Sequence, residues 1–164
     1  MMERTIILLK PDATIRGLLG QVLQKFECMG FRIAGMKFLF LSDELVYGLY
    51  PALKHKPFHD QVKTAMQMAP SLALVLAGNN AVRNAVKLAG PALKSEENDP
   101  STIRGMFSMW TGADVIHRAT TREEAEAQIA LFFQENEILN YSRADGFVLS
   151  QQGWDSGAAP FLST

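Results

Sequence analysis

One apolar, β-branched run near the start of the chain constrains its fold more than any other feature. Residues Thr5–Leu9 read Thr-Ile-Ile-Leu-Leu, with no alternation of polar and apolar positions. This pattern predicts a strand buried on both of its faces. Lys10-Pro11-Asp12 follows at once, and a proline ends a strand because it has no backbone N–H to donate. Any fold of this chain therefore has to cover this strand with other elements.

The rest of the chain alternates between strand and helix patterns. Turn residues and helix caps bound most of these segments, and apolar residues recur within them. Residues 91–113 look irregular, and a loop of that length inside a compact domain is usually functional. The predicted strands are 31–41, 72–76 and the short run around Val115 and Ile116; the predicted helices are 18–29, one opened by Ser42, one starting near Pro57, 81–89 and 121–133.

The order of these segments indicates an α/β (α+β) fold. Strand, helix, strand, helices, strand, helix, strand, helix is compatible with a split βαβ arrangement, in which a four-stranded antiparallel sheet has helices on one face. A doubly wound parallel sheet is the alternative. Four short strands and the absence of Gly-x-Gly-x-x-Gly after the first strand argue against it.

Composition limits the class of protein. The chain has 164 residues, enough for one domain with a sizeable core, and its net charge of −1 argues against bulk attraction to nucleic acid or an anionic membrane. No apolar run approaches 18 residues, and the first residues lack the order of a secretory signal. The single cysteine, Cys28, excludes an internal disulfide and is expected in the core. We expect a cytoplasmic protein with no membrane partner.

A histidine marks the most suggestive stretch. His117 ends the run Asp114-Val115-Ile116-His117, and Thr120 or Thr121 then caps the next helix. Free backbone N–H groups at such a junction suit work on an anion. Considered alone, a histidine beside apolar residues is more often a satisfied core residue.

Five features, in order along the chain, give the sequence a likeness to a known family. It resembles the nucleoside diphosphate kinases over roughly residues 3–151. This predicts a kinase-like domain at 1–151 and a tail at 152–164 that either packs on a neighbouring subunit or is disordered. The five features are Lys10-Pro11-Asp12, Arg16-Gly17-Leu18-Leu19-Gly20, Tyr50 followed by Lys56-Pro57-Phe58, Thr102-Ile103-Arg104-Gly105, and Val115-Ile116-His117.

The resemblance implies a ferredoxin-like fold, a homo-oligomer (hexamer or tetramer) and a ping-pong reaction. In that reaction His117 would take the γ-phosphoryl group from a nucleoside triphosphate and pass it to a nucleoside diphosphate. Mg²⁺ would arrive on the nucleotide phosphates, with no protein metal ligands. A histidine suits the role, because its ordinary pKa of about 6.5 leaves it a neutral nucleophile near pH 7.

The resemblance also implies catalytic roles for four residues. His117 is the nucleophile, Lys10 supplies positive charge to the phosphates, and Tyr50 lies beside the histidine. Gln128 stands where the family has a glutamate that orients the histidine. A glutamine can accept an imidazole N–H, but it gives the phosphorylated ring no charge stabilisation.

The nucleotide-binding residues follow in the same way. Arg104 and Lys10 match phosphate-binding positions, and Phe58 matches the aromatic residue on which the base stacks. Val62 matches an apolar residue that covers the base. Asp114 stands where the family has an asparagine that contacts the sugar, so it brings a negative charge near the phosphates.

Further departures fall in the same pocket. Val86 stands where a second phosphate-binding arginine is expected, and the adjacent Lys87 points about 100° away on a helix. Ala92 and Ala119 replace a threonine and a serine. Arg118 replaces a glycine and either supplies some of the lost positive charge or obstructs the pocket. We therefore expect a kinase with weakened or altered activity; the alternative is a non-catalytic nucleotide-binding or assembly relative.

Overall fold

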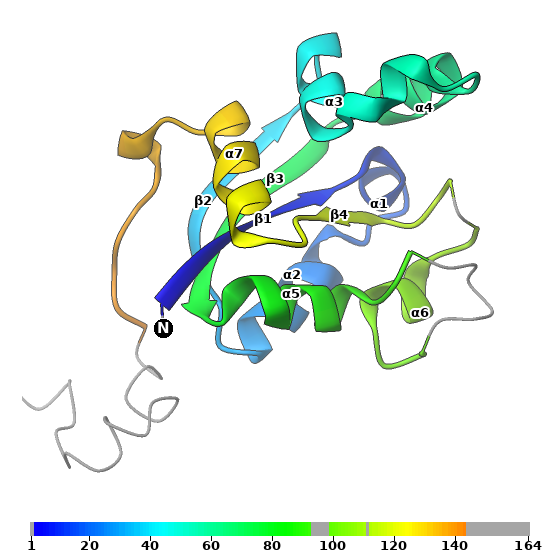
Figure 1. The fold of residues 1–164 in the computed structure, drawn as a ribbon. Helices are drawn as coiled ribbons and strands as arrows, with labels where there is room; N and C mark the ends of the chain where they lie inside the picture. Colours follow the sequence, from blue (N-terminus) through cyan, green and yellow to red (C-terminus); the bar gives the residue numbers. More distant parts are fainter. Residues whose placement is uncertain (1, 93–98, 111, 144–164) are drawn as a thin grey trace, which may run out of the picture.

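The protein folds around one four-stranded antiparallel sheet (Figure 1). The computed structural model describes residues 2–92, 99–110 and 112–143. The strand order is β2-β3-β1-β4, so β1 lies inside the sheet and β2 and β4 form its edges. The strands are β1 (Met2–Leu9), β2 (Arg32–Leu39), β3 (Ser71–Asn79) and β4 (Ile116–Arg118).

Every strand pairing in this sheet is antiparallel. β1 pairs with β3 from Met2 opposite Asn79 to Leu9 opposite Leu72. On its other side β1 pairs with the short β4, where Leu8 lies opposite His117. The predicted split βαβ, ferredoxin-like sheet is confirmed, and the parallel alternative is wrong.

The helices connect and cover these strands. Most follow the predicted segments, although the helix expected near Pro57 begins two residues later, with Phe58 as its N-cap. The α-helices are α1 (Pro11–Ile15), α2 (Leu19–Cys28), α3 (Asp43–Leu49), α4 (His59–Gln67), α5 (Ala81–Ala89), α6 (Ile103–Phe107) and α7 (Arg122–Phe132); short 3-10 helices are η1 (Pro51–His55) and η3 (Glu135–Glu137).

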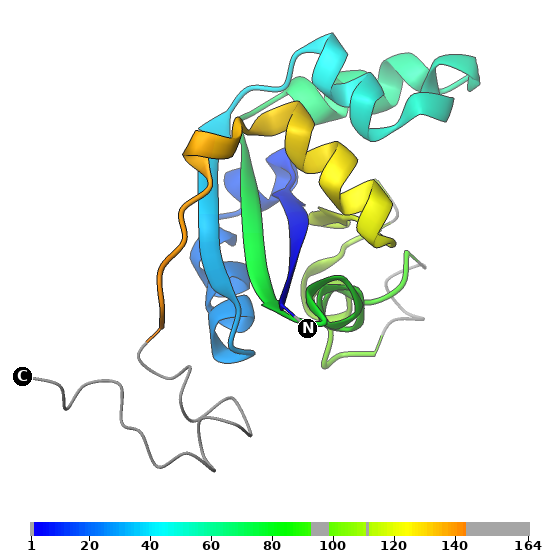
Figure 2. The ribbon, with the colours of Figure 1, turned by 60° about the vertical axis from the view of Figure 1, so that its left-hand side comes forward.

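Helices cover both faces of the sheet, so the expectation of helices on one face is wrong. Ile7 and Leu9 of β1 pack in a core with α2 and α5, whereas Ile6 and Leu8 pack on the other face against α3 and α7. Figure 2 shows α2 and α7 on opposite sides of the strands. The cause is visible in the sequence of β1, because two buried faces require apolar residues at successive positions.

Two local expectations are corrected. The segment 91–113, expected to be irregular, contains α6, whose N-cap Thr102 accepts a hydrogen bond from the Gly105 N–H at 3.0 Å. A helix of five residues is too short to show a helical period in the sequence. Cys28, expected in the core, is exposed because α2 directs Val22 and Phe26 inward and ends at Cys28.

The C-terminal expectations lie outside the described residues. These are the domain boundary at 151 and the tail 152–164. Within the described part of the chain, no helix combines the length and apolar composition needed to cross a bilayer.

Candidate active site

The site is built where β1 ends beside the segment that leads into β4. The backbone N–H of Lys10 donates to the Val115 carbonyl at 2.8 Å, and the Val115 N–H donates to the Asp12 carboxylate at 3.2 Å. Val115 is fully buried and has a φ of 69°. A β-branched residue in this left-handed region is strained by about 1–3 kcal/mol and persists only where its surroundings hold it. Lys10 and Asp12 thus fix the backbone two residues before His117.

His117 is buried, with 8% of its surface exposed, and its ring meets Tyr50 edge to face at a centroid distance of 5.0 Å. Burial lowers the pKa of His117 to about 4, against a smaller opposing effect from Gln128. The imidazole is therefore neutral at physiological pH. Burial also raises the pKa of Tyr50, which stays a neutral phenol.

A hydrogen-bonded relay fixes the tautomer of the histidine. The Gln128 amide nitrogen donates to the Glu124 carboxylate at 3.0 Å, so the Gln128 carbonyl oxygen is the atom that faces the ring. This oxygen lies 2.9 Å from His117 Nε2, which must carry the proton that it accepts. Glu124 is held in turn by the backbone N–H and hydroxyl of Thr120, at 2.7 and 2.6 Å. Nδ1 is left as the nitrogen with a free lone pair.

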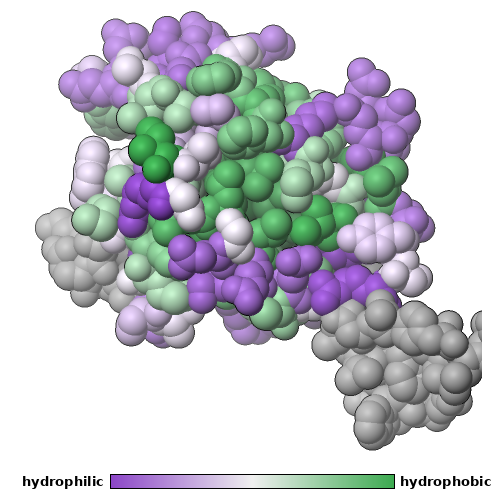
Figure 3. All heavy atoms as spheres, turned by 180° about the vertical axis from the view of Figure 1, so that it is seen from behind, coloured by the Kyte–Doolittle hydropathy of each residue, from purple (hydrophilic) through white to green (hydrophobic). Residues whose placement is uncertain are grey.

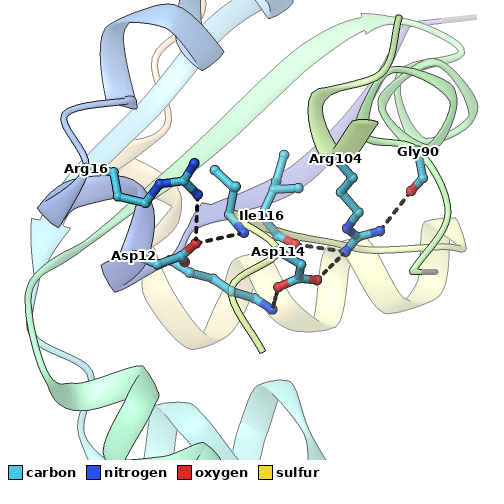
Figure 4. A network of polar contacts seen from close by, with 8 residues as sticks. Asp12, Arg16, Gly90, Arg104, Asp114 and Ile116 are labelled. Atoms are coloured by element: carbon cyan, nitrogen blue, oxygen red, sulfur yellow. Dashed lines mark hydrogen bonds and ion pairs between the residues drawn. The ribbon is translucent and has the colours of Figure 1, made fainter. Parts of the chain in front are cut away.

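Asp114 lies between the two cations predicted to bind phosphate. Its carboxylate accepts from the Lys10 ammonium through one oxygen and lies 3.2 Å from an Arg104 guanidinium nitrogen through the other (Figure 4). Burial lowers the pKa of Lys10, but Tyr50 and Asp114 more than offset this and raise it overall. Lys10 is therefore charged, and its charge is compensated by an internal carboxylate.

Arg104 is committed further to the backbone. It is buried, and its two terminal nitrogens donate to the carbonyls of Gly90 and Ile116, both at 2.8 Å (Figure 4). These bonds tie α6 to the end of α5 and to β4. Its Nε is buried without a hydrogen-bond partner. A phosphate at the terminal nitrogens would therefore have to share or displace contacts that Arg104 already makes.

An open cleft of about 670 Å³ leads away from this cluster. Its size suits a small-molecule ligand. Lys10, Tyr50, Phe58 and Val62, all predicted site residues, lie along it. His117, Arg104, Asp114 and Gln128 are buried, so the predicted residues form a deep polar cluster and an apolar cleft that meet at Lys10 and Tyr50.

The sequence analysis did not single out Trp110, which lines the cleft with Phe58 and is 65% exposed. It belongs to the 91–113 segment, which was expected to be irregular. The available signal was a tryptophan four residues before the run that starts at Asp114 and ends at His117.

The departures from the family pattern have distinct surroundings. Val86 is half-buried on α5 and Lys87 is exposed, so the helix offers no cation in place of the expected arginine. Ala92 is exposed, and Ala119 is fully buried against α7. Arg118 is half-buried; burial and nearby Arg104 lower the pKa of its guanidinium, while Glu124 and Asp114 raise it. Its Nε is buried without a hydrogen-bond partner. Arg118 thus adds positive charge to this region.

The carboxylates at the inner end of the cleft are already engaged. Asp114 is paired with Lys10 and Arg104, and Asp12 accepts from Val115 and lies 3.8 Å from Arg16. Within the described ranges, no three His, Cys, Asp or Glu residues come together to hold a metal ion.

The family model of nucleoside diphosphate kinase matches residues 3–138 of this sequence. The chain belongs to the nucleoside diphosphate kinase family. Among curated members, it is 37% identical over 142 residues to the enzyme of Oceanobacillus iheyensis, covering 87% of this chain and 95% of that one. It is 37% identical over 139 residues to nucleoside diphosphate kinase A of Rattus norvegicus, covering 85% and 91%. Membership in this family supports nucleotide phosphotransfer.

Solved structures of nucleoside diphosphate kinases share the fold. The enzyme of Halobacterium salinarum, solved in complex with CDP, matches with a TM-score of 0.86 and 31% identity, covering 92% of this chain and all of that one. The Aquifex aeolicus enzyme matches with a TM-score of 0.79 and 32% identity, covering 85% and 100%. The ferredoxin-like fold and the family resemblance are confirmed.

Asp114→Asn tests whether the internal carboxylate competes with phosphate. In the free protein the substitution leaves Lys10 and Arg104 without their shared counter-charge, so we expect a lower melting temperature. We also expect Mg²⁺–ADP to bind about tenfold more tightly, because its phosphates no longer displace an anion. Calorimetric titration measures the affinity. Asp43→Asn, which removes the same charge outside the cleft, is the control. An unchanged affinity in Asp114→Asn would contradict the competition.

The protonation of His117 gives a second prediction. We expect a midpoint near pH 4 in the folded protein, against about 6.5 when unfolded. As the pH falls, the unfolded chain takes up this proton first. The contribution of His117 to stability is therefore present above pH 6.5 and lost as the pH falls towards 4. An NMR titration of the three histidines, with His117 assigned from His117→Ala, measures the midpoint. A value near 6.5 would show that the ring is not held neutral by burial.

Proposed function

We propose that this protein moves the γ-phosphoryl group of a nucleoside triphosphate to a nucleoside diphosphate by a ping-pong reaction through His117. One observation carries the proposal. His117 is a buried, neutral histidine whose Nε2–H is committed to Gln128, which leaves the Nδ1 lone pair available beside Lys10 and Tyr50. Such a group is a nucleophile that needs no base to deprotonate it.

The two half-reactions balance without a proton transfer. The Nδ1 lone pair forms a bond to the γ-phosphorus as the bond to the β–γ bridging oxygen breaks, and the nucleoside diphosphate leaves with that electron pair. The ring keeps its Nε2 proton and becomes cationic. A terminal oxygen of a second nucleoside diphosphate then attacks the phosphorus, and the N–P electron pair returns to Nδ1. Positioning and positive charge supply most of such catalysis.

We propose that this activity is weaker than that of a family member with the usual pocket residues, for two reasons. Gln128 accepts the Nε2 proton but carries no charge to stabilise the cationic ring. Asp114 already pairs with Lys10 and Arg104, so incoming phosphates must displace it. Each effect is on the order of 1–3 kcal/mol. Arg118 offsets part of this loss by adding positive charge near Arg104.

The cleft accounts for the nucleotide in this proposal. The base stacks on Phe58, which is 47% exposed, and packs against Val62. The sugar lies towards Asp114, whose carboxylate can accept from a hydroxyl, and the phosphates reach Lys10. The relative from Halobacterium salinarum, solved with CDP, supports a nucleotide in a member of this fold.

A magnesium ion fits this scheme as part of the substrate. Asp12 and Asp114 are engaged by protein partners, so phosphate oxygens and water would be its ligands. Bound there, it would neutralise phosphate charge during transfer.

We also propose that the protein is located in the cytoplasm, as expected from its sequence.

We also propose that the protein is a homo-oligomer, either a hexamer or a tetramer. Met36, Phe38 and Phe40 alternate on one face of the edge strand β2 and its extension, and all three are exposed. Apolar side chains gather across the middle of the back face in Figure 3. An exposed apolar patch of this kind is typical of a protein–protein interface. Light scattering gives the mass in solution, and a monomeric mass would contradict the proposal.

Incubation with Mg²⁺ and γ-labelled ATP tests the reaction. We expect an acid-labile label on His117, which moves to GDP when the washed protein is chased. His117→Ala should abolish transfer and keep ADP binding, because the proposed contacts to the base and the phosphates come from Phe58, Val62 and Lys10. Transfer by His117→Ala above background would show that His117 is not the residue that carries the phosphoryl group. Bound ATP without any label would favour the alternative, a non-catalytic nucleotide-binding relative.

Exchanging Gln128 and Glu124 tests the first of these two reasons, the missing charge beside the ring. Gln128→Glu alone places a carboxylate against Glu124, whereas combining it with Glu124→Gln keeps a single carboxylate and moves it next to the ring. We expect the double variant to form phosphohistidine about tenfold faster, since a charge-assisted hydrogen bond replaces a neutral one. The single Gln128→Glu variant should gain less. Rapid-quench measurement of labelling compares them with Glu124→Gln, and a double variant no faster than the parent would refute this account.

A further inference from the structure

The cleft carries an aromatic side chain that the proposed reaction does not use. Trp110 and Phe58 both line the cleft, and they are 65% and 47% exposed. They come from different parts of the fold, since Phe58 precedes α4 and Trp110 lies in the segment between α6 and β4. In Figure 1, α4 and the segment between α6 and β4 lie at the same end of the sheet, where β1 runs into α1. Single exposed apolar residues are ordinary, but two exposed aromatic rings on one apolar cleft point to a ligand that covers them.

The two rings leave space between them. In the described part of the chain, the ring pairs in contact are Phe26–Phe31 and Tyr50–His117, and neither Phe58 nor Trp110 has a ring partner. If the walls of the cleft were in contact, the rings of Phe58 and Trp110 would be expected to touch each other. Lys10, Asp12 and Tyr50 line the cleft beside the buried polar cluster, and the exposed Lys56 and Gln61 line it as well.

The local backbone fixes Trp110 in this position. The Ala113 N–H donates to the Trp110 carbonyl at 2.9 Å, and the Met109 N–H donates to the Ala113 carbonyl at 3.1 Å. The indole lies directly over Gly112, where an added Cβ would come within 2.2 Å of two ring carbons. Gly112 thus leaves room for the six-membered ring of the indole against the backbone. A ring placed in advance loses little conformational freedom when a ligand binds.

We propose that Trp110 is a second stacking surface for the nucleobase, acting with Phe58, and that it makes the site favour purine over pyrimidine nucleotides. Every base has a π-face, so stacking alone tolerates any base. A purine has two fused rings and offers each aromatic side chain more overlap than a pyrimidine. The preference then comes from contact area rather than from hydrogen bonds to base edges. The inference rests on the proposed nucleotide site, but it concerns binding and does not require turnover.

Fluorescence gives a direct readout. The chain has two tryptophans, Trp110 and Trp154, so Trp154→Phe leaves Trp110 as the only one. In this background we expect ADP to quench the emission. Pyrophosphate, which carries the phosphates without a base, should leave the emission unchanged at concentrations that displace ADP. Equal quenching by both would overturn the proposal, because the signal would then report the phosphates.

Substitution separates stacking from structure. Trp110→Leu should weaken ADP binding roughly 5- to 100-fold, with a smaller loss for CDP, while Trp110→Phe should restore most of the affinity. Gly112→Ala keeps the tryptophan in the sequence but moves its ring, because the added Cβ would clash with it. This variant should therefore lose more affinity for ADP than for CDP, as Trp110→Leu does. Equal losses for ADP and CDP, or unchanged ADP affinity in Trp110→Leu, would overturn the proposal.

These outcomes are distinguishable from failure of the proposed function. ADP quenching with no label on His117 would leave the stacking role standing and remove the kinase reaction. Label on His117, together with unchanged ADP affinity in Trp110→Leu, would support the kinase reaction and remove the stacking role of Trp110.

Discussion

The strained backbone of Val115 is the constraint on which the site depends. A buried valine with a φ of 69° keeps that conformation only because Lys10 and Asp12, at the end of β1, bond to its carbonyl and N–H. The same contact brings Lys10 to Asp114 and sets the register in which His117 lies opposite Leu8. The proposed nucleophile and the proposed phosphate-binding lysine therefore come from one junction between two strands, supported by a sheet that is buried on both faces.

Two chains of polar contacts leave this junction in different directions. One runs from His117 through Gln128 and Glu124 to Thr120 and fixes which ring nitrogen carries the proton. The other runs from Lys10 through Asp114 to Arg104 and compensates the charges that a phosphate would use. The first chain leaves Nδ1 of the histidine with a free lone pair, whereas the second pairs both cations with an internal carboxylate. In the proposed reaction the first arrangement favours attack by the histidine and the second opposes entry of the phosphates.

The cleft adds a third element that depends on shape more than charge. Phe58 and Trp110 present exposed rings along the cleft, outside the buried polar cluster that contains Asp114 and Arg104. A ligand with an aromatic part and an anionic part would span both regions. In the proposed site, base recognition and phosphate binding are thus carried by separate segments, and a change in one can leave the other intact.

The sequence by itself determined the fold class, the family and most of the site's membership. Apolar runs and helix caps are local patterns, and the matched motifs name Lys10, Tyr50, Phe58, Arg104 and His117 directly. Tertiary structure decided what these residues do to one another. The pairing of Asp114 with two cations, the tautomer of His117 and the position of Trp110 all depend on contacts between segments far apart in the chain. Charge compensation and burial act through space, and local sequence patterns carry no record of distances between such segments.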